Sequence, residues 1–215
     1  MSDMLRPGGM KITESALREI MLIPNSHILD VGCGSGATVT YLRKLGYNAL
    51  GVDITLPPDA PQELICADAT ALPFDSGTMD AVFFECSLSK FAAPEAALLE
   101  AQRVLKPGGA LVVSDLFTRG EACEFTGILG RIEPWKELCA RIESQGFALQ
   151  YFEEYPDALA TFWGQLVFDH GLAEATELIC DCANTTSLTF GSVNALKSKD
   201  NSYFFAVFCC GAPPQ

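Results

Sequence analysis

Residues 28–39 constrain the fold of this chain more than any other stretch. An apolar run broken by one acid is followed by three glycines at alternate positions, Gly32, Gly34 and Gly36, and then by a helical pattern. Glycines permit positive φ angles and let the backbone approach a ligand closely. The N-terminus of the next helix presents unpaired N–H groups. The stretch therefore predicts a strand, a turn and a helix that form a nucleotide-type cofactor site.

The glycine pattern alone leaves the cofactor open. Gly32-x-Gly34-x-x-Ala37 satisfies the dinucleotide fingerprint, and Asp53 follows about 20 residues later, where an acid that binds a ribose belongs. An NAD-type cofactor and S-adenosylmethionine are both compatible with this pattern. A glycine turn that binds nothing is the third interpretation.

Length and composition predict one domain spanning residues 1–215. Hydrophobic residues make up 49% and charged residues 19%, as in globular chains with one sizeable core. The apolar runs, such as Ala110 to Val113, are too short to span a bilayer. Met1 to Gly9 contains no apolar segment that would mark a secretory signal. We therefore expect a cytoplasmic protein without membrane contact.

The charge balance argues against a nucleic-acid partner. The formal net charge is −13, and no cluster of Lys and Arg appears along the chain. Binding to a phosphate backbone requires a basic face that displaces counterions. An acidic field suits a cationic small molecule instead. The sequence leaves a homodimer open.

The nine cysteines are expected to be reduced core thiols. Their number is odd, and several lie in apolar segments, as is usual for buried cysteines of intracellular proteins. Two close pairs, Cys180-x-Cys182 and Cys209-Cys210, could bind a soft metal or metalloid. Neither pair has zinc-finger spacing, and the chain has only two histidines. We therefore expect no metal site.

Strand and helix patterns alternate along the chain. Thr13 is placed to cap the first helix, and Gly46 to end the second. Proline and glycine mark the other boundaries. The expected helices are 12–22, 36–45, one opened by Pro94, one opened by Pro134, one from Pro156 to Gly171 and one from Leu172; the expected strands are 28–32, 48–53, 64–67, 80–86, 110–115, 147–152 and 203–210.

This order predicts an α/β fold. We expect a doubly wound, Rossmann-like, mainly parallel sheet of seven strands with helices on both faces and an antiparallel last strand. The core is expected over residues 12–153. Residues 156–198 form a helical insertion in this interpretation, and residues 203–210 form the final strand.

Acidic residues recur at one edge of the predicted sheet. Asp30 lies late in the first strand, and four more acids lie at or near the ends of the next four strands, at positions 53, 68, 85 and 115. Ligands of open α/β sheets bind outside the carboxyl ends of the strands. Clustered carboxylates repel one another unless a cationic or hydrogen-bonding group is bound. They would oppose the pyrophosphate of NAD and suit a sulfonium and an ammonium.

Four motifs in order make the chain resemble the class I S-adenosylmethionine-dependent methyltransferases. The resemblance covers roughly residues 12–153 and is greatest to the small-molecule group that includes the ubiquinone and menaquinone C-methyltransferases. The motifs are Asp30-Val-Gly-Cys-Gly-Ser-Gly, Gly51-Val-Asp53, Ala67-Asp68-Ala69 with Leu72-Pro-Phe, and Arg103-Val-Leu-Lys-Pro-Gly-Gly-Ala-Leu-Val-Val-Ser-Asp115.

The resemblance implies where the methionine end of the cofactor would bind. Gly32, Cys33 and Gly34 would pass their backbone along the methionine moiety, and Asp30 would hold its ammonium directly or through water. The cofactor implied is S-adenosyl-L-methionine.

The resemblance also assigns the adenosine end. Asp53 would accept both ribose hydroxyls, and Ile54 would pack on the adenine face. Asp68 would accept from the adenine N6 amine, and the Ala69 N–H would face the ring. The alternative for both acids is a structural role in a turn.

Glu85, Cys86 and Ser87 would line the place where the methyl group leaves the cofactor. The expected activity is methyl transfer to a small-molecule acceptor by in-line displacement, which requires mainly juxtaposition and exclusion of water. A general base is required only if the acceptor must lose a proton. Glu85 is one candidate, and His170 is another, although His170 could equally cap a helix.

The acceptor is expected to contact the N-terminal segment and the late helices. Arg6 could bind an anionic group or simply lead into the first helix. Phe162 and Trp163 have the spacing of core residues, and Phe168 lies on the same helix.

Three alternatives remain open at this point. One is an NAD-dependent oxidoreductase. Another is a non-catalytic cofactor-binding module that serves a partner protein. The third is a thiol or metalloid methyltransferase that uses the cysteine pairs.

Overall fold

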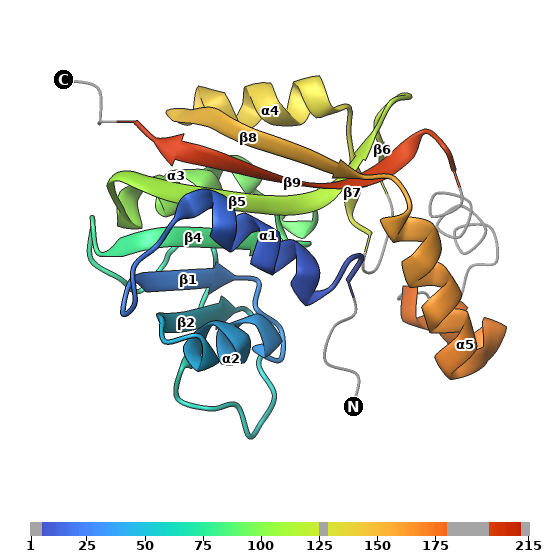
Figure 1. Cartoon of the computed structure of the whole chain (residues 1–215), viewed down its shortest axis with the longest axis horizontal. Helices are drawn as coiled ribbons and strands as arrows, with labels where there is room; N and C mark the ends of the chain where they lie inside the picture. Colours follow the sequence, from blue (N-terminus) through green and yellow to red (C-terminus); the bar gives the residue numbers. More distant parts are fainter. Residues whose placement is uncertain (1–5, 125–128, 180–197, 212–215) are drawn as a thin grey trace.

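The computed structural model describes residues 6–124, 129–179 and 198–211. Within them, seven strands form one twisted sheet in the order β3-β2-β1-β4-β5-β9-β8 (Figure 1). Strands β1 to β5 pair in parallel, whereas β9 is antiparallel to both of its neighbours. This confirms the predicted fold class. The strands are β1 His27–Val31, β2 Asn48–Asp53, β3 Leu64–Cys66, β4 Met79–Glu85, β5 Leu105–Thr118, β8 Phe147–Tyr155 and β9 Asn201–Cys210.

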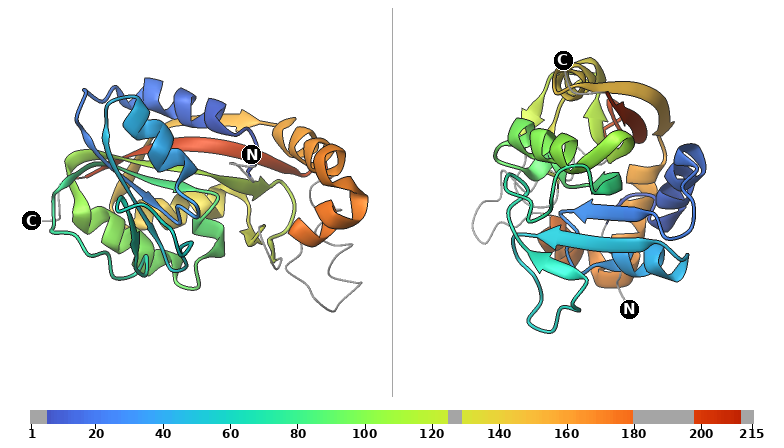
Figure 2. Two further views of the ribbon diagram at one scale, coloured as in Figure 1. Left: turned by 90° about the horizontal axis from the view of Figure 1, so that it is seen from below. Right: turned by 90° about the vertical axis from the view of Figure 1, so that its left-hand side faces the viewer.

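Helices cover both faces of the sheet. Helices α1 and α2 lie on one face, and α3 and α4 lie on the other (Figure 2). The helices are α1 Met10–Ile20, α2 Ala37–Lys44, α3 Pro94–Val104, α4 Trp135–Ser144 and α5 Ala158–Ile179, with a 3-10 turn, η1, over Leu88–Lys90 and a small hairpin of β6 Cys123–Glu124 and β7 Arg131–Ile132.

The alternation of side chains along the strands divides the core in two. Phe83 packs with α1 and α2, and its neighbour Phe84 packs with α3 and α4. Tyr203 and Phe204 on β9 separate in the same way. Because both faces are covered, these strands are apolar without interruption.

Both predicted bounds of the strand that corresponds to β5 were wrong. Strand β5 begins at Leu105 instead of Ala110, because Leu105 pairs with Met79 before a register shift between Met79 and Ala81. The Lys-Pro-Gly-Gly segment therefore lies inside the strand, where Gly108 adopts a φ of 78°. Strand β5 also continues beyond Asp115, because antiparallel pairing with β9 extends to Thr118.

The expected cap at Thr13 was also wrong. Helix α1 begins at Met10, and Gly9 occupies the N-cap position with a φ of 53°. Thr13 is therefore an interior residue of the helix, and it is buried. Its hydroxyl contributes to the functional site instead of the helix end.

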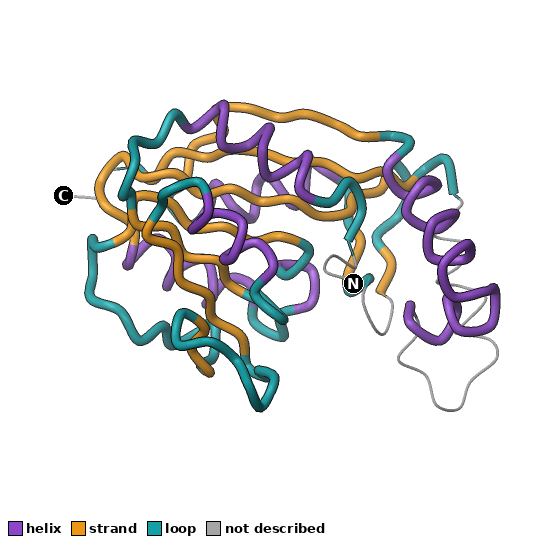
Figure 3. Tube along the Cα trace, turned by 60° about the horizontal axis from the view of Figure 1, so that its bottom comes forward, coloured by secondary structure: helices purple, strands orange, loops and turns teal. Residues whose placement is uncertain are grey.

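Helix α5 interrupts the path from β8 to β9. It lies at the end of the sheet toward which the parallel strands run (Figures 1 and 3). The predicted break at Gly171 is present, since this residue has φ 79° and ψ 163° inside the helix. The rest of the predicted insertion lies outside the described residues, and so do Cys180 and Cys182. The division into core, insertion and final strand stays a prediction.

Candidate cofactor site

Each glycine of the turn after β1 has a positive φ, and each meets a different environment. A Cβ at Gly32 would collide with the side chain of Ser87, and one at Gly36 would collide with Leu64. At Gly34 a Cβ would meet no atom within 4 Å. The first and third glycines are thus required by packing within the protein. Gly34 instead leaves open space in front of its backbone, where a ligand can approach.

Asp53, at the end of β2, is hydrogen-bonded to this turn. Its Oδ2 accepts from the Gly34 N–H at 2.8 Å, and its Oδ1 accepts from the Thr55 N–H at 3.1 Å. The turn is also held by the carbonyl of Val52, which accepts from Gly32 and Cys33. The end of β2 and the glycine turn therefore form one rigid unit.

Asp68 follows β3 and forms a tight local turn. Its Oδ1 accepts from both the N–H and the hydroxyl of Thr70, each at 2.8 Å. These hydrogen bonds lower the pKa of the exposed Asp68 carboxyl. Beside it, Ile54 has 70% of its surface exposed. An exposed isoleucine next to a carboxylate is a suitable surface for a flat polar ring.

A cavity of about 500 Å³ lies over the ends of β1, β2 and β3. Its volume is in the range of sites for small organic ligands. Six of the predicted residues line it, and the segment after β4 closes it on one side. The six are Gly32, Asp53, Ile54, Asp68, Ala69 and Ser87.

The segment after β4 is fixed to both neighbouring strands. The Ser87 hydroxyl donates to the Val31 carbonyl at 2.7 Å, which joins the segment to β1. The Ser89 N–H donates to Asp115 Oδ2 at 3.0 Å, which joins it to β5. Burial raises the pKa of the Asp115 carboxyl, and these backbone hydrogen bonds act in the opposite direction. Asp115 thus positions this segment from β5.

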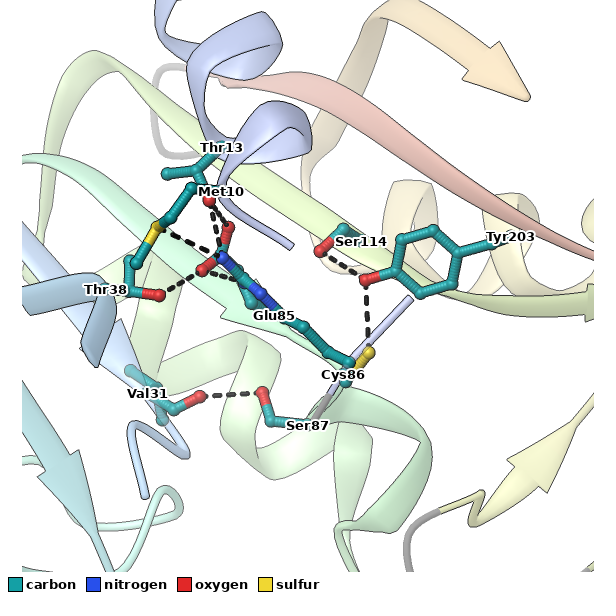
Figure 4. Close-up of polar contacts among 10 residues, drawn as sticks. Met10, Thr13, Val31, Thr38, Glu85, Cys86, Ser87, Ser114 and Tyr203 are labelled. Atoms are coloured by element: carbon teal, nitrogen blue, oxygen red, sulfur yellow. Dashed lines mark hydrogen bonds and ion pairs between the residues drawn. The ribbon is translucent and has the colours of Figure 1, made fainter. Parts of the chain in front are cut away.

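Cys86 adopts a left-handed backbone conformation with a φ of 53°. Its Sγ lies 3.1 Å from the Tyr203 hydroxyl, which donates to the Ser114 hydroxyl at 3.0 Å (Figure 4). Burial, and secondarily the charge of Asp115, raises the pKa of the thiol to about 12. Burial also raises the pKa of Tyr203. Both groups are therefore neutral near pH 7.

Glu85 lies at the centre of a second buried network. Arg6 forms an ion pair with it. Its Oε1 accepts from Thr13 at 2.8 Å, and its Oε2 accepts from Thr38 at 2.7 Å (Figure 4). Arg6 also donates to the Thr13 hydroxyl at 2.6 Å. In the structure, Arg6 thus binds a carboxylate of its own chain, and a contact between Arg6 and an anionic group of the acceptor stays a prediction.

Asp30 is buried beside this network. Burial and, secondarily, the charge of Glu85 raise the pKa of the Asp30 carboxyl well above its ordinary value, whereas Arg6 lowers it. Burial also raises the pKa of the neighbouring Cys33 thiol to about 12, with further contributions from Asp30 and Asp53. Arg6 thus acts on both carboxyls, since it pairs with Glu85 and lowers the pKa of Asp30.

The remaining predicted residues lie elsewhere. His170 is on α5, where its Nδ1 lies 3.3 Å from Glu174 Oε1. Phe162 and Trp163 are buried in the core, as their spacing predicts, and Phe168 on the same helix is exposed.

Cys209 and Cys210 are the last residues of β9. Cys209 pairs with Ala110, near the beginning of the part of β5 that pairs with β9, so both cysteines lie at the end of the sheet opposite to the cavity. Over residues 6–124, 129–179 and 198–211, no group of three or more His, Cys, Asp and Glu side chains could hold a metal ion. In the same ranges, no helix is long and apolar enough to cross a bilayer.

Comparison with known proteins identifies the family. A model described as "Methyltransferase domain" matches residues 29–113. The demethylmenaquinone methyltransferase of Mycobacterium tuberculosis is 34% identical over 173 residues, which cover 77% of this chain and 70% of that protein. The chain belongs to the class I S-adenosylmethionine-dependent methyltransferases. This confirms the resemblance and the expected cofactor, and it does not favour the NAD-dependent alternative.

Other relatives match part of their length or the fold alone. The demethylmenaquinone methyltransferase of Renibacterium salmoninarum is 35% identical over 102 residues, which cover 43% of this chain and only 42% of that protein. The geranyl diphosphate C-methyltransferase of Streptomyces coelicolor has a TM-score of 0.65 at 16% identity and covers 93% of this chain and 81% of its own. The similarity to the Streptomyces coelicolor structure shows that the two chains share a fold.

The residues of the cavity fit S-adenosylmethionine. The open space in front of Gly34 admits the methionine end close to the backbone. Asp53 and Asp68 supply carboxylates where a ribose diol and an exocyclic amine require acceptors. Asp30 supplies a buried carboxylate directly before Val31, which lines the cavity, and an ammonium requires such an acceptor. Sequence reasoning missed Tyr203, although it is the one tyrosine in a run otherwise rich in phenylalanine.

Proposed function

We propose that this methyltransferase transfers a methyl group from S-adenosylmethionine to a small-molecule acceptor. The observation that carries the proposal is the cavity over β1, β2 and β3. Its glycine turn, which leaves open space at Gly34, stands beside Asp53 and Asp68. Family membership supplies the reaction class, and the carboxylates supply the preference for a cationic ligand.

The chain's own residues would bind and orient the cofactor. Asp53 would accept the ribose hydroxyls while keeping the Gly34 N–H in place, because a carboxylate oxygen can accept more than one hydrogen bond. Asp68 would accept from the adenine amine, and Ile54 would cover the ring. The methionine ammonium would be held by Asp30.

The acceptor would meet the cofactor beside Cys86 and Ser87. When bound, S-adenosylmethionine supplies a methyl group that its sulfonium has already activated. The protein then has to align the acceptor and exclude water. The segment after β4 favours both, because hydrogen bonds hold it to β1 and β5. We assign no general base to Glu85, because both of its oxygens are hydrogen-bonded. His170 pairs with Glu174 on α5, and we assign it none either.

The relatives suggest the first acceptor to test. Several are named for demethylmenaquinone, and another for a phytyl hydroquinone. These names are those of a quinone and of a hydroquinone. Because the sulfonium methyl is electrophilic, its acceptor must be a nucleophile, and we therefore place short-chain demethylquinols, the reduced form, first in the acceptor panel.

Isothermal titration calorimetry with S-adenosylhomocysteine and NAD tests the cofactor. We expect micromolar affinity for the former and none for the latter, and the opposite result would contradict the proposal. A second assay follows the release of S-adenosylhomocysteine with each acceptor. Cofactor binding without turnover across the whole panel, together with a co-purifying partner protein, would favour a non-catalytic binding module instead.

A further inference from the structure

Three charged side chains from distant parts of the chain are buried next to the cofactor turn. Asp30 on β1 is the register partner of Phe83 on the parallel strand β4, so Asp30 and Glu85, two residues further on, lie on the same face of the sheet. Arg6 comes from the segment before α1 and pairs with Glu85. The exposed fractions are 3% for Asp30, 9% for Arg6 and 3% for the Glu85 side chain. Burying a charge is costly unless it is compensated. The cluster must therefore balance its charges internally or with a ligand.

Arg6 and Glu85 compensate each other. They form an ion pair, and the Thr13 hydroxyl bridges them by accepting from Arg6 and donating to Glu85. Thr38 donates to the second Glu85 oxygen. With both Glu85 oxygens engaged and the guanidinium directed at this carboxylate, the pair is close to neutral as a unit.

Asp30 is the remaining charge of the cluster. With Asp30 ionised, two carboxylates face one guanidinium, and the cluster carries one surplus negative charge. With Asp30 protonated, the cluster is neutral. The state of Asp30 therefore determines whether the cluster attracts a cation.

We propose that Arg6 is a positioning residue that sets the charge of Asp30: by neutralising Glu85 it lets Asp30 ionise when the ammonium of the cofactor binds, so that cofactor binding releases a proton from Asp30 to solvent. The inference rests on the proposed function, because it takes S-adenosylmethionine as the ligand. It adds a role for Arg6, which contacts Glu85 and Thr13 beside Asp30.

Other titratable groups lie next to the cluster, and one of them, Asp53, also acts on the pKa of Asp30. Asp53 on β2 and Cys33 in the turn face Asp30. Cys86, directly after β4, and Tyr203, on β9, face Arg6. The thiols and the phenol are neutral near pH 7, because burial raises their pKa values. Asp53 is a further carboxylate near Asp30, and it opposes ionisation of Asp30 in every variant below.

The experiment measures ligand affinity by calorimetry from pH 5 to 8.5. The probes are S-adenosylhomocysteine, which carries the ammonium, and 5′-methylthioadenosine, which lacks the whole amino-acid end. For the wild type, we expect the affinity for S-adenosylhomocysteine to fall by up to about tenfold per pH unit below the midpoint, since one proton is linked to binding. The affinity for 5′-methylthioadenosine should stay flat. Proton release should also appear as a dependence of the heat on the buffer.

Two substitutions should shift the midpoint in opposite directions. Arg6→Gln removes the cation, so Asp30 holds its proton to higher pH and the midpoint rises. Glu85→Gln removes the competing carboxylate, so the midpoint falls. Arg6→Lys keeps the charge and should restore most of the wild-type profile. Arg18→Gln removes a cation from the exposed part of α1, where Arg18 contacts Ser15, and should change nothing.

The outcomes separate the possible failures. Absence of S-adenosylhomocysteine binding to the wild type at every pH would overturn the proposed function. Binding without proton release, or equal profiles for the wild type and Arg6→Gln, would overturn only the role of Arg6. Binding of 5′-methylthioadenosine reports whether a variant is folded. If Arg6→Gln does not bind 5′-methylthioadenosine, the role of Arg6 is tested by two other measurements, the shift of the midpoint in Glu85→Gln and the proton release of the wild type.

Discussion

The N–H of Gly34 donates to Asp53 Oδ2 at 2.8 Å, so the glycine turn after β1 and the end of β2 hold each other in place. Asp53 lines the cavity, and a Cβ at Gly34 would meet no atom within 4 Å. In the proposed function, Asp53 would bind the ligand and also shape the turn that receives the rest of it. Substitutions at Asp53 must therefore be tested for both effects.

Asp53→Ala should weaken S-adenosylhomocysteine binding about ten- to a hundredfold. A hydrogen bond to a charged group contributes roughly 1.5–3 kcal/mol, and this change also releases the Gly34 N–H. Calorimetry of the variant and of Asp53→Asn, which retains one oxygen, checks the prediction. An unchanged dissociation constant for Asp53→Ala would reduce Asp53 to a turn residue.

Gly34→Ala should lower cofactor affinity far more than it lowers stability. A Cβ at Gly34 meets no protein atom within 4 Å, so its cost to folding is mainly that of a positive φ, about 1 kcal/mol. It would, however, stand in the space assigned to the ligand. Gly46→Ala is the matched control, because Gly46 also has a positive φ and open surroundings but lies away from the cavity. Equal losses of affinity in both variants would contradict the assignment.

Asp30→Asn should stabilise the ligand-free protein at neutral pH and weaken cofactor binding. Burial, followed by the charge of Glu85, raises the native pKa of Asp30. The carboxyl therefore favours folding below its ordinary pKa of about 3.9, and this contribution is lost as pH rises through the raised value. Thermal unfolding from pH 4 to 8 should show the two proteins diverging as pH rises. Each kcal/mol gained corresponds to about 2–4 °C in a chain of this size. A variant that is less stable at every pH would contradict the prediction.

Asp68→Asn should reduce the preference for adenine over hypoxanthine. The wild-type carboxylate accepts from an amine and repels the carbonyl that replaces it, whereas an amide can donate to that carbonyl. We expect the wild type to bind S-adenosylhomocysteine about ten- to a hundredfold more tightly than S-inosylhomocysteine. Competition binding with both ligands measures the ratio. If the ratio of the two affinities is the same in the wild type and in Asp68→Asn, Asp68 has only a structural role, in the turn that it forms with Thr70.

Iodoacetamide should modify Cys66 before Cys33 and Cys86 in the native protein. Cys66 is exposed, whereas burial raises the pKa of both other thiols to about 12. At pH 7.5 such a thiol is ionised in fewer than about one molecule in ten thousand, and the thiolate is the reactive form. Mass spectrometry of peptides after timed labelling gives the order. Rapid labelling of native Cys86 would show that the segment after β4 opens in solution.

The cofactor half of the site could be predicted because it is local. The glycine turn, Asp53 and Asp68 each follow directly after a strand, and parallel strands place such residues at one edge. Strand β2, which ends in Gly-Val-Asp53, is six residues long, and the sequence pattern predicted its bounds, Asn48–Asp53, correctly. The assignment of these residues to particular ligand groups stays a prediction.

The interior network could not be predicted because its contacts are long-range. Thr13 has the sequence context of a cap, and only the fold shows that its hydroxyl bridges Arg6 and Glu85. Cys86 and Tyr203 are 117 residues apart, and no local pattern links them. Strand β5 begins early because Leu105 pairs with Met79. The sequence does not indicate this pairing, because Lys-Pro-Gly-Gly is a typical signal for the end of a helix.

The left-handed backbone at Cys86 has a consequence for biosynthesis. Such a conformation costs about 1–3 kcal/mol in a residue other than glycine and requires support from its surroundings. Tyr203 on β9 gives part of that support, although it follows Cys86 by 117 residues. We expect a nascent chain that has not yet formed β9 to fold the glycine turn without fixing the segment beside it. The segment after β4 would then reach its final conformation only after β9 has been synthesised.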